Sequence, residues 1–270
     1  MILSPVARFV TRYLALAYVL ILVIVPVGLI LLRTFEPGVG AFFGSITTPA
    51  AVSALQLSLL VVAIVVPLNV IFGVPTALLL ARKRFRGKGI LQAVIDLPFA
   101  VSSVVVGVAL ILLWGSAGIL GFAENSLGFK IIFGLPGIVL ASIFVTVPFV
   151  IREVEPVLHE LGTEQEQAAA TLGATWWQTF WRITLPSIRW GLTYGILLTV
   201  ARTLGEYGAV IMVSSNLPGQ SQTLTLLVSD RYNRGNEYGA YAVATLLMMV
   251  AVLVLVAQTI LEARRGKAQS

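Results

Sequence analysis

An uncharged apolar run near the N-terminus limits what this chain can fold into. No charged residue lies between Arg12 and Arg33, and most side chains from Tyr13 to Leu32 are large and apolar. A helix that crosses a bilayer needs about 20 such residues. Basic residues precede the run, as in a signal peptide, but the run is longer and no small-residue cleavage site follows it. We therefore expect a retained first membrane-spanning helix.

Five further apolar stretches follow. With the first, the predicted spans are 13–32, 52–81, 94–114, 136–151, 188–213 and 238–261. The second contains Pro67 and Pro75, which predict a kink or a tilt, and the fourth is short. Only 11% of residues are charged and 58% are hydrophobic, whereas soluble domains carry about 25% charged residues. We predict an all-α polytopic membrane protein with six transmembrane helices. Its parts are an N-terminal helix with an outer loop (1–51), a membrane core (52–262) and a basic tail (263–270).

The lysines and arginines predict which helix ends face the cytoplasm. If the N-terminus is inside, the loops on the outer side hold only Arg33, Lys130, Arg231 and Arg234 of the 18 basic residues. Nearly all the others flank the inner ends of the spans, as is typical of cytoplasmic loops. Both termini and the loop 163–186 are therefore expected in the cytoplasm. Because the basic residues lie beside apolar spans, the net charge of +6 does not indicate a nucleic-acid partner.

The loop 163–186 is the longest patterned stretch outside the spans. Thr163 is followed three residues later by Glu166, and Thr175 is followed three residues later by Gln178. This spacing predicts two capping boxes, in which the hydroxyl accepts a free backbone N–H and the later side chain returns a bond.

A bend is expected between these two helix starts. Gly173 stands where a left-handed residue ends a helix at the lowest cost. Pro186 is expected to close the second helix, because proline lacks a backbone N–H. The prediction is two short helices joined by a sharp bend at the membrane surface.

This loop resembles the EAA loop in the permease subunits of type I ABC importers. The family pattern is Glu-Ala-Ala, three residues, glycine, nine residues and Ile-x-Leu-Pro. This chain departs from the pattern at one position, where Gln167 replaces the family's glutamate. The resemblance implies that the loop docks into a cleft on a cytoplasmic ATPase subunit. The residues that it implicates in coupling are Glu164, Glu166, Gln167, Ala168, Ala169, Gly173, Ile183, Leu185 and Pro186.

Four further stretches are similar to the sulfate/thiosulfate branch of this family, and specifically to the W-type member of a two-permease pair. They are 96–102, 135–141, 144–153 and 205–210. The last reads Gly-Glu-Tyr-Gly-Ala-Val and is shared in similar form with molybdate permeases.

The resemblance implies a complete transport machine in the plasma membrane of a prokaryote. An extracytoplasmic binding protein would deliver sulfate or thiosulfate to a pore formed by this subunit and a sister permease subunit. Two copies of an ATPase subunit, which bind ATP and Mg²⁺, would grip the cytoplasmic loops. This chain would contribute the transmembrane domain, with its permease core in residues 52–262, and would hold no cofactor itself.

Two charged residues, Arg202 and Glu206, lie within the fifth predicted span. On insertion scales, a charged side chain at the bilayer centre costs about 2.5–3.5 kcal/mol. The i, i+4 spacing puts both residues on one helix face. Two interpretations stay open: a polar element of the translocation path or its gate, or an ion pair that locks the span to a neighbour. Hydroxyl residues grouped with them are Ser102, Ser103, Thr199 and Thr203. Separately, Gly191 and Gly195 predict close helix packing.

The sequence also excludes several kinds of site. It contains no G-x-x-x-x-G-K-[S/T] motif, so no P-loop ATPase site is expected in this chain. With no cysteine and one histidine, His159, thiolate and multi-histidine metal sites are excluded. His159 is expected in a solvated loop, and no catalytic or metal-binding residue is predicted. We interpret four tryptophans as an aromatic anchor at the membrane interface and not as a surface on which nucleic-acid bases stack. They are Trp176, Trp177, Trp181 and Trp190.

Other functions remain open. A molybdate or tungstate permease, expected as a homodimer, shares the sequence of residues 205–210. An ion-coupled secondary transporter would need carboxylates within the membrane, and Glu206 is the one clear candidate. A membrane enzyme has little support, because the usual metal, thiol and serine-hydrolase motifs are missing.

Overall fold

The computed structural model describes residues 5–122, 126 and 130–269, and this part of the chain is built from helices. In chain order they are α1 (Pro5–Phe35), α2 (Val39–Ile46), α3 (Pro49–Arg82), α4 (Lys88–Ala100), α5 (Ser103–Trp114), α7 (Leu135–Leu161), α8 (Glu164–Thr171), α9 (Trp176–Thr179), the π-helical turn η1 (Phe180–Thr184), α10 (Leu185–Leu204), α11 (Gly208–Val213), α12 (Leu224–Asn233) and α13 (Glu237–Gln269). The predicted all-α class is confirmed.

Four described helices are long and apolar enough to cross a membrane. Their candidate spans are Thr11–Phe35, Pro49–Arg82, Leu135–Leu161 and Glu237–Val254. The prediction that the fourth span is short was wrong, because α7 continues for ten residues beyond Ile151. Charged residues end an apolar run, but they do not end the backbone hydrogen bonding of a helix.

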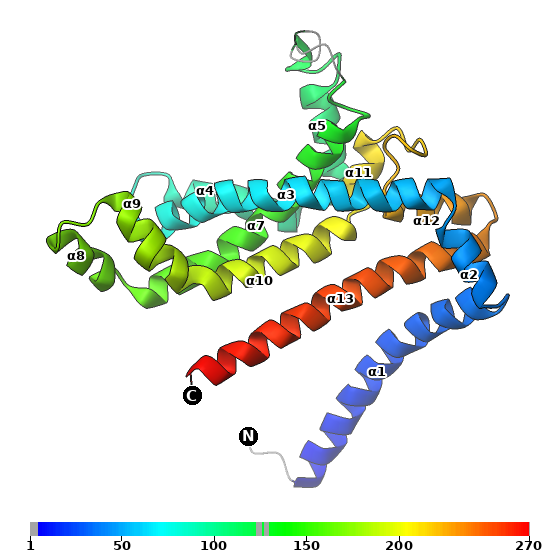
Figure 1. Cartoon of the computed structure of the whole chain (residues 1–270), viewed down its shortest axis with the longest axis horizontal. Helices are drawn as coiled ribbons and strands as arrows, with labels where there is room; N and C mark the ends of the chain where they lie inside the picture. Colours follow the sequence, from blue (N-terminus) through cyan, green and yellow to red (C-terminus); the bar gives the residue numbers. More distant parts are fainter. Residues whose placement is uncertain (1–4, 123–125, 127–129, 270) are drawn as a thin grey trace.

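The stretch 94–114, expected to form one span, is instead bent. The chain bends by 116° between α4 and α5, and in Figure 1 α5 rises steeply from the layer formed by α3, α7 and α10. Val101 has extended backbone angles at this corner. Pro98 lies just before it and supplies no N–H to the last turn of α4. The bend places Ser103, the partly buried first residue of α5, within hydrogen-bond distance of α10.

The stretch 188–213 is also interrupted. Helix α10 ends at Leu204, and α11 begins at Gly208 after a short turn. A Cβ atom on Gly208 would lie 3.0 Å from Ser103 Cβ, and one on Gly107 would lie 2.6 Å from Met212 Cβ. These two glycines therefore allow α5 and α11 to pack at close range.

An arginine joins the short helices at the end of the molecule away from α8. Arg231 of α12 donates hydrogen bonds to the Ser45 carbonyl, the Thr48 hydroxyl and the Gly239 carbonyl, at 2.7–3.2 Å. Burial lowers the pKa of the Arg231 guanidinium. These bonds fix the corners where α2 leads into α3 and where α13 begins.

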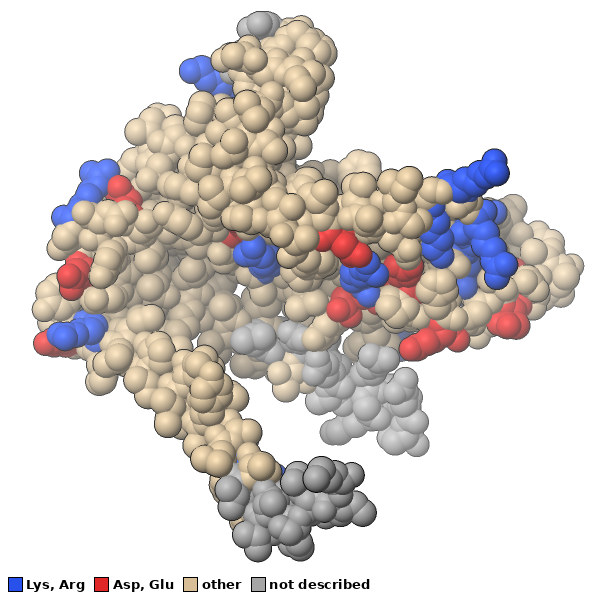
Figure 2. Space-filling view, turned by 180° about the vertical axis from the view of Figure 1, so that it is seen from behind, with Lys and Arg blue, Asp and Glu red and all other residues tan. Residues whose placement is uncertain are grey.

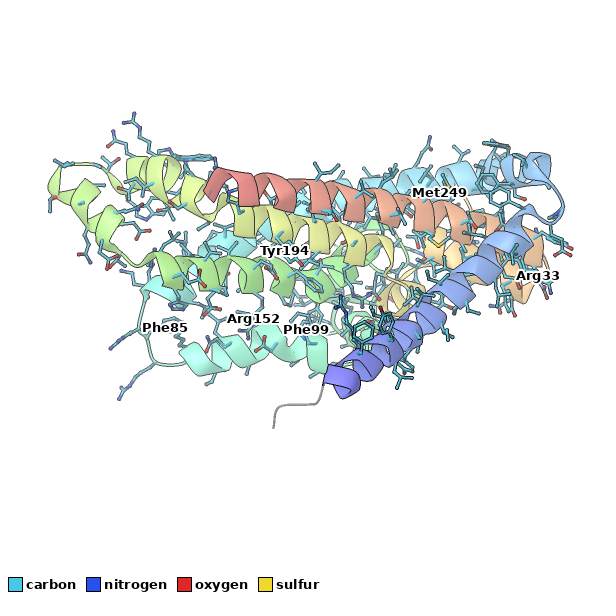
Figure 3. The ribbon with its side chains drawn as sticks, turned by 90° about the horizontal axis from the view of Figure 1, so that it is seen from below. Arg33, Phe85, Phe99, Arg152, Tyr194 and Met249 are labelled. Atoms are coloured by element: carbon cyan, nitrogen blue, oxygen red, sulfur yellow. The ribbon has the colours of Figure 1, made fainter. Side chains whose placement is uncertain are left out.

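Most of the surface outside these corners carries no charge. Figure 2 shows charged side chains at both ends and a smaller group of acidic and basic side chains near the middle, with uncharged surface around them. Helix α1 stands apart from the bundle in Figure 1, and none of its apolar window is buried. It is tied to α13 by a hydrogen bond of 2.8 Å between the buried hydroxyls of Thr34 and Thr245. Figure 3 places Arg33 and Phe85 at opposite ends of the long axis.

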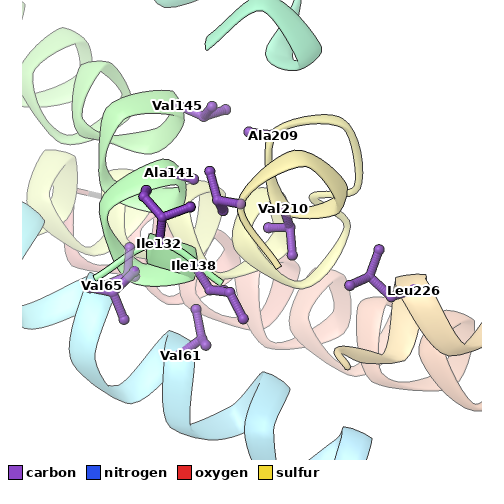
Figure 4. Packing of buried hydrophobic residues seen from close by; sticks show 11 residues of the cluster. Val61, Val65, Ile132, Ile138, Ala141, Val145, Ala209, Val210 and Leu226 are labelled. Carbon is purple, nitrogen blue, oxygen red and sulfur yellow. The ribbon is translucent and has the colours of Figure 1, made fainter. Parts of the chain in front are cut away.

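The core lies where α3, α7 and α11 meet. Figure 4 shows Val61 and Val65 of α3 beside Ile138 of α7, with Val210 of α11 next to them. Asn69 is fully buried in the same layer and donates to Thr146 Oγ1 at 2.6 Å. Such interhelical bonds are a common form of attachment between membrane helices.

The close packing predicted for the glycines of α10 is confirmed. A Cβ on Gly191 would lie 2.6 Å from the Glu153 carbonyl oxygen, and one on Gly195 would lie 3.0 Å from Val150 Cα. Helix α10 therefore lies directly against the backbone of α7.

Candidate functional site

The loop between α7 and α10 has the predicted bend and one of the two predicted capping boxes. Gly173 adopts a left-handed φ of +82°. The Thr175 N–H donates to Gln178 Oε1 (2.9 Å), and the Gln178 N–H donates to Thr175 Oγ1 (3.3 Å). The first capping box was wrong, because Thr163 Oγ1 accepts its bond from Gln167 Nε2 (2.8 Å) and not from a backbone N–H.

Glu166 faces the body of the protein, which explains why it does not cap α8. Its Oε2 lies 3.1 Å from Arg82 Nε, and its Oε1 accepts bonds from Arg82 Nη2 (3.2 Å) and Thr184 Oγ1 (3.0 Å). Arg82 also donates to the Leu158 carbonyl at 2.7 Å. The side chains of Arg82 and Glu166 are only 15% and 24% exposed. The Glu166 carboxylate thus ties α8 to α3 and η1, and Arg82 extends the connection to the end of α7. We call these bonds the Glu166 node.

The prediction that Pro186 closes the second short helix was wrong. The chain stays helical from α9 through η1 into α10, and the Leu185 N–H donates to the Phe180 carbonyl, five residues earlier. A π-helical turn is wider than an α-helical turn. Pro186 occupies the first turn of α10, where a missing N–H is tolerated. The loop therefore continues directly into α10 without a break.

The opposite side of the loop is open. Leu172 is 87% exposed and Trp176 is 72% exposed. Trp176 stacks on Phe180 with ring centroids 5.8 Å apart, and Trp177 meets Trp181 edge-on at 5.5 Å. Of the other residues implicated by resemblance, Glu164, Gln167, Ala168, Gly173 and Pro186 are exposed, Ile183 and Leu185 are half-buried, and Ala169 is buried. The loop thus has an anchored inner side and an apolar, aromatic outer side.

Arg202 and Glu206 form the predicted ion pair, but at a helix end. Arg202 lies in the last turn of α10, and Glu206 lies in the turn before α11. Arg202 Nη2 is 2.8 Å from Glu206 Oε2, and the other carboxylate oxygen accepts the Ala209 N–H at 2.9 Å. The same guanidinium nitrogen donates to Ser103 Oγ at 3.2 Å. The Glu206 side chain is 1% exposed and that of Arg202 is 38% exposed.

The hydroxyl residues grouped with this pair are only partly brought to it. Ser103, the first residue of α5, contacts Arg202. Ser102 precedes it, is exposed and makes no capping bond with its side chain. Thr199 is buried and donates to the carbonyl of Gly195 in its own helix at 2.8 Å, and Thr203 is buried. The structure therefore assembles Arg202, Glu206 and Ser103, whereas Thr199 bonds within α10.

A second ion pair was missed by the sequence reasoning. Arg152 of α7 donates from Nε to Asp96 Oδ1 of α4 at 2.9 Å, and its Nη2 contacts the other carboxylate oxygen. Both side chains are half-exposed, and Figure 3 shows Arg152 between α4 and α7. Fifty-six residues separate the partners, so no spacing rule links them.

His159 lies on α7 and not in a loop, which corrects the sequence expectation. Its Nε2 is 3.6 Å from Oε1 of the buried Glu155, which also accepts a bond from Gln92 Nε2 at 3.3 Å. This polar group lies on the same helix as the Arg152 pair. Together they give α7 several carboxylates and a single arginine.

The chain matches a known family over most of its length. The model for binding-protein-dependent transport system inner membrane components matches residues 73–267. The chain is 46% identical to the sulfate transport system permease protein CysW of Synechococcus elongatus, over 94% of this chain and 88% of that protein. It is 39% identical to the protein of the same name from Escherichia coli, over 90% and 84% of the two chains.

A solved structure shares the fold. A chain from a bacterial alginate ABC transporter, in complex with its alginate-bound periplasmic protein, superposes with a TM-score of 0.76 at 17% identity, covering 96% of this chain and 95% of that one. The arrangement of helices described above is therefore that of an ABC importer permease. The chain belongs to the family of inner membrane components of binding-protein-dependent transport systems.

Proposed function

We propose that this chain is the permease subunit of an ATP-driven importer for sulfate or thiosulfate. The observation that carries the proposal is the loop 163–186, which is fastened through Glu166 to Arg82 of α3 and to Thr184 of η1 and presents an apolar outer side. The permeases named CysW, at 39–46% identity, support sulfate as the transported ion. Membership of the family makes the chain a multi-pass membrane component, and we place it in the plasma membrane of a prokaryote.

We infer that the polypeptide crosses the membrane six times. The crossings would be α1, α3, the bent pair α4 and α5, α7, the interrupted pair α10 and α11, and α13. In this arrangement α8 and α9 lie on the cytoplasmic side together with both termini, and α2 and α12 lie outside. The positive-inside distribution of lysine and arginine supports this orientation.

We propose that the outer side of the loop contacts an ATPase subunit. Leu172 and Trp176 are exposed on either side of Gly173, and large apolar side chains of this kind are common anchors in protein interfaces. The ATPase would be present in two copies and would bind ATP and Mg²⁺. The coupling residues Glu164, Gln167, Ala168 and Ala169 would orient the loop on that surface, and Glu166 would hold it to the membrane helices.

The remaining partners of the proposed importer act outside and within the membrane. An extracytoplasmic sulfate-binding protein would deliver the anion, and a sister permease would complete the pore as a heterodimer. Arg202, Glu206, Ser102, Ser103, Thr199 and Thr203 are the residues that we assign to the translocation path or its gate. A partly exposed ion pair among apolar helices supports this, since such charges usually face a water-filled cavity or another subunit.

The test is purification of the tagged subunit from its native membrane, followed by reconstitution into liposomes. We expect an ATPase and a second, different permease to co-purify. With the binding protein present, the vesicles should accumulate radiolabelled sulfate only when ATP is supplied to the ATPase side. Recovery of an ATPase alone, with uptake of molybdate in place of sulfate, would replace the proposal with a homodimeric molybdate permease. Uptake without any ATPase would refute an ATP-driven importer.

A further inference from the structure

The guanidinium of Arg202 has one side held and one side open. Glu206 and Ser103 both lie at the same nitrogen, at 2.8 and 3.2 Å. Yet the Arg202 side chain remains 38% exposed, whereas its carboxylate partner is 1% exposed. An arginine presents five N–H donors in a planar fork, so donors remain on the exposed side. Ser102, whose hydroxyl makes no capping bond, is exposed at the adjoining start of α5.

Glu206 is held independently of the arginine. Its second oxygen accepts the Ala209 N–H, and its own carbonyl accepts the Thr225 hydroxyl at 2.8 Å. The carboxylate is therefore fixed by α11, and the pair has no net charge. A free arginine in an apolar site would bind an anion strongly. With a carboxylate beside it, the attraction is reduced but the donors on the open side are kept.

We propose that the open side of Arg202 binds the tetrahedral dianion during its passage, and that Glu206 weakens this binding so that the anion is released. This inference rests on the proposed function and assigns separate roles to the two residues. Conduction requires a site that is favourable enough to enter and weak enough to leave. An arginine with a fixed neighbouring carboxylate meets both requirements.

The Asp96–Arg152 pair is less suited to this role. Asp96 engages Nε and Nη2 of Arg152 together, so two donors and one edge of that guanidinium are already taken. Glu153 and Glu155 follow on the same helix, and their charges would repel a dianion. Arg202 has one carboxylate partner, whereas Arg152 has Asp96 and two glutamates near it, so the Arg202 pair is favoured as the anion site.

The test separates binding from transport in the purified permease complex. Binding of radiolabelled sulfate to the detergent-solubilised complex, without the binding protein, gives Kd. ATP-dependent uptake into liposomes, with saturating binding protein, gives the maximal rate. The variants are Glu206→Gln, Arg202→Gln, Arg202→Lys and the double variant Arg202→Gln/Glu206→Gln. The matched control is Arg234→Gln, which removes an exposed arginine that also pairs with a carboxylate four residues away.

The proposal predicts opposite effects from the two single changes. Glu206→Gln keeps the acceptor for the Ala209 N–H but removes the competing charge, so Kd should fall about tenfold, the size of effect that one nearby charge exerts on an ionic equilibrium, while the maximal rate falls. Arg202→Gln should lose saturable binding, Arg202→Lys should retain weakened binding, and the double variant should stay without binding. The Arg234 control should match the wild type.

Other outcomes overturn the inference. Wild-type Kd and uptake in the double variant would show that the pair only locks α10 in place. An unchanged Kd in Glu206→Gln would remove its tuning role. If Arg202→Gln does not accumulate in the membrane, Arg202→Lys decides, and a wild-type Kd with a wild-type rate in Arg202→Lys refutes the proposal. A wild-type complex without ATP-dependent sulfate uptake would instead refute the proposed function.

Discussion

Replacing Glu166 with glutamine should loosen the coupling loop without removing its outer surface. The change keeps the size of the side chain but removes the charge that meets Arg82 at 3.1 and 3.2 Å and the Thr184 hydroxyl at 3.0 Å. Hydrogen bonds to charged groups contribute about 1.5–3 kcal/mol and neutral ones about 1 kcal/mol. Because Arg82 and Glu166 are partly shielded from solvent, we expect a net loss of about 2 kcal/mol, which corresponds to about a 30-fold shift toward a detached loop.

Hydrogen exchange measures this shift directly. The amides of α8 should exchange about 30-fold faster in Glu166→Gln, since protection reports the free energy of local opening. In reconstituted complexes, the sulfate imported per ATP hydrolysed should fall. Glu164→Gln is the matched control for the exchange measurement, because Glu164 lies two residues earlier and is exposed, so α8 should exchange in that variant at the wild-type rate. Equal protection of α8 in the Glu166 and Glu164 variants would refute the reasoning that the node holds the loop.

Three further substitutions test the packing, the second ion pair and the bend. Gly107→Val would place a Cβ 2.6 Å from Met212 Cβ. It should destabilise the α5–α11 contact by about 1–3 kcal/mol and so lower the thermal unfolding temperature of the purified complex. An unchanged temperature would contradict the packing argument. Asp96→Asn should cost at most about 1 kcal/mol, because its pair with Arg152 is half-exposed, so a large loss of folded protein would show that the pair is shielded by a partner subunit. Gly173→Ala forces a side chain into a left-handed backbone and should cost about 1–2 kcal/mol, with slower uptake at normal membrane levels; wild-type uptake would argue against a role for the bend.

The length of the apolar runs predicted the long helices well, because the requirement to cross lipid constrains every residue of a span. It failed where a helix continues past charged residues, as α7 does after Ile151. It also failed at the two interruptions near Val101 and Gly205, which lie inside stretches long and apolar enough to be taken for single spans. Backbone breaks inside a bundle are decided by packing against neighbours, and a single sequence does not report those neighbours.

In the candidate site, contacts between residues close in sequence were predicted and contacts between distant residues were not. Spacing along the chain predicted the Arg202–Glu206 pair and the Thr175–Gln178 capping box, since their partners are three or four residues apart. The Glu166–Arg82 bond joins residues 84 positions apart and had no signal in the spacing. The Pro186 prediction failed because a wide helical turn precedes it, and that turn depends on how the loop meets α10.

The continuity of α9, η1 and α10 has a mechanical consequence. Together they form one uninterrupted stretch of helical backbone from the exposed Trp176 to Leu204 beside Arg202, and Figure 1 shows that it bends where α9 leads into α10. The Gly191 and Gly195 contacts hold the middle of α10 against the backbone of α7. No non-helical linker separates the loop from the arginine, so a displacement of the loop would reach α10 through main-chain hydrogen bonds.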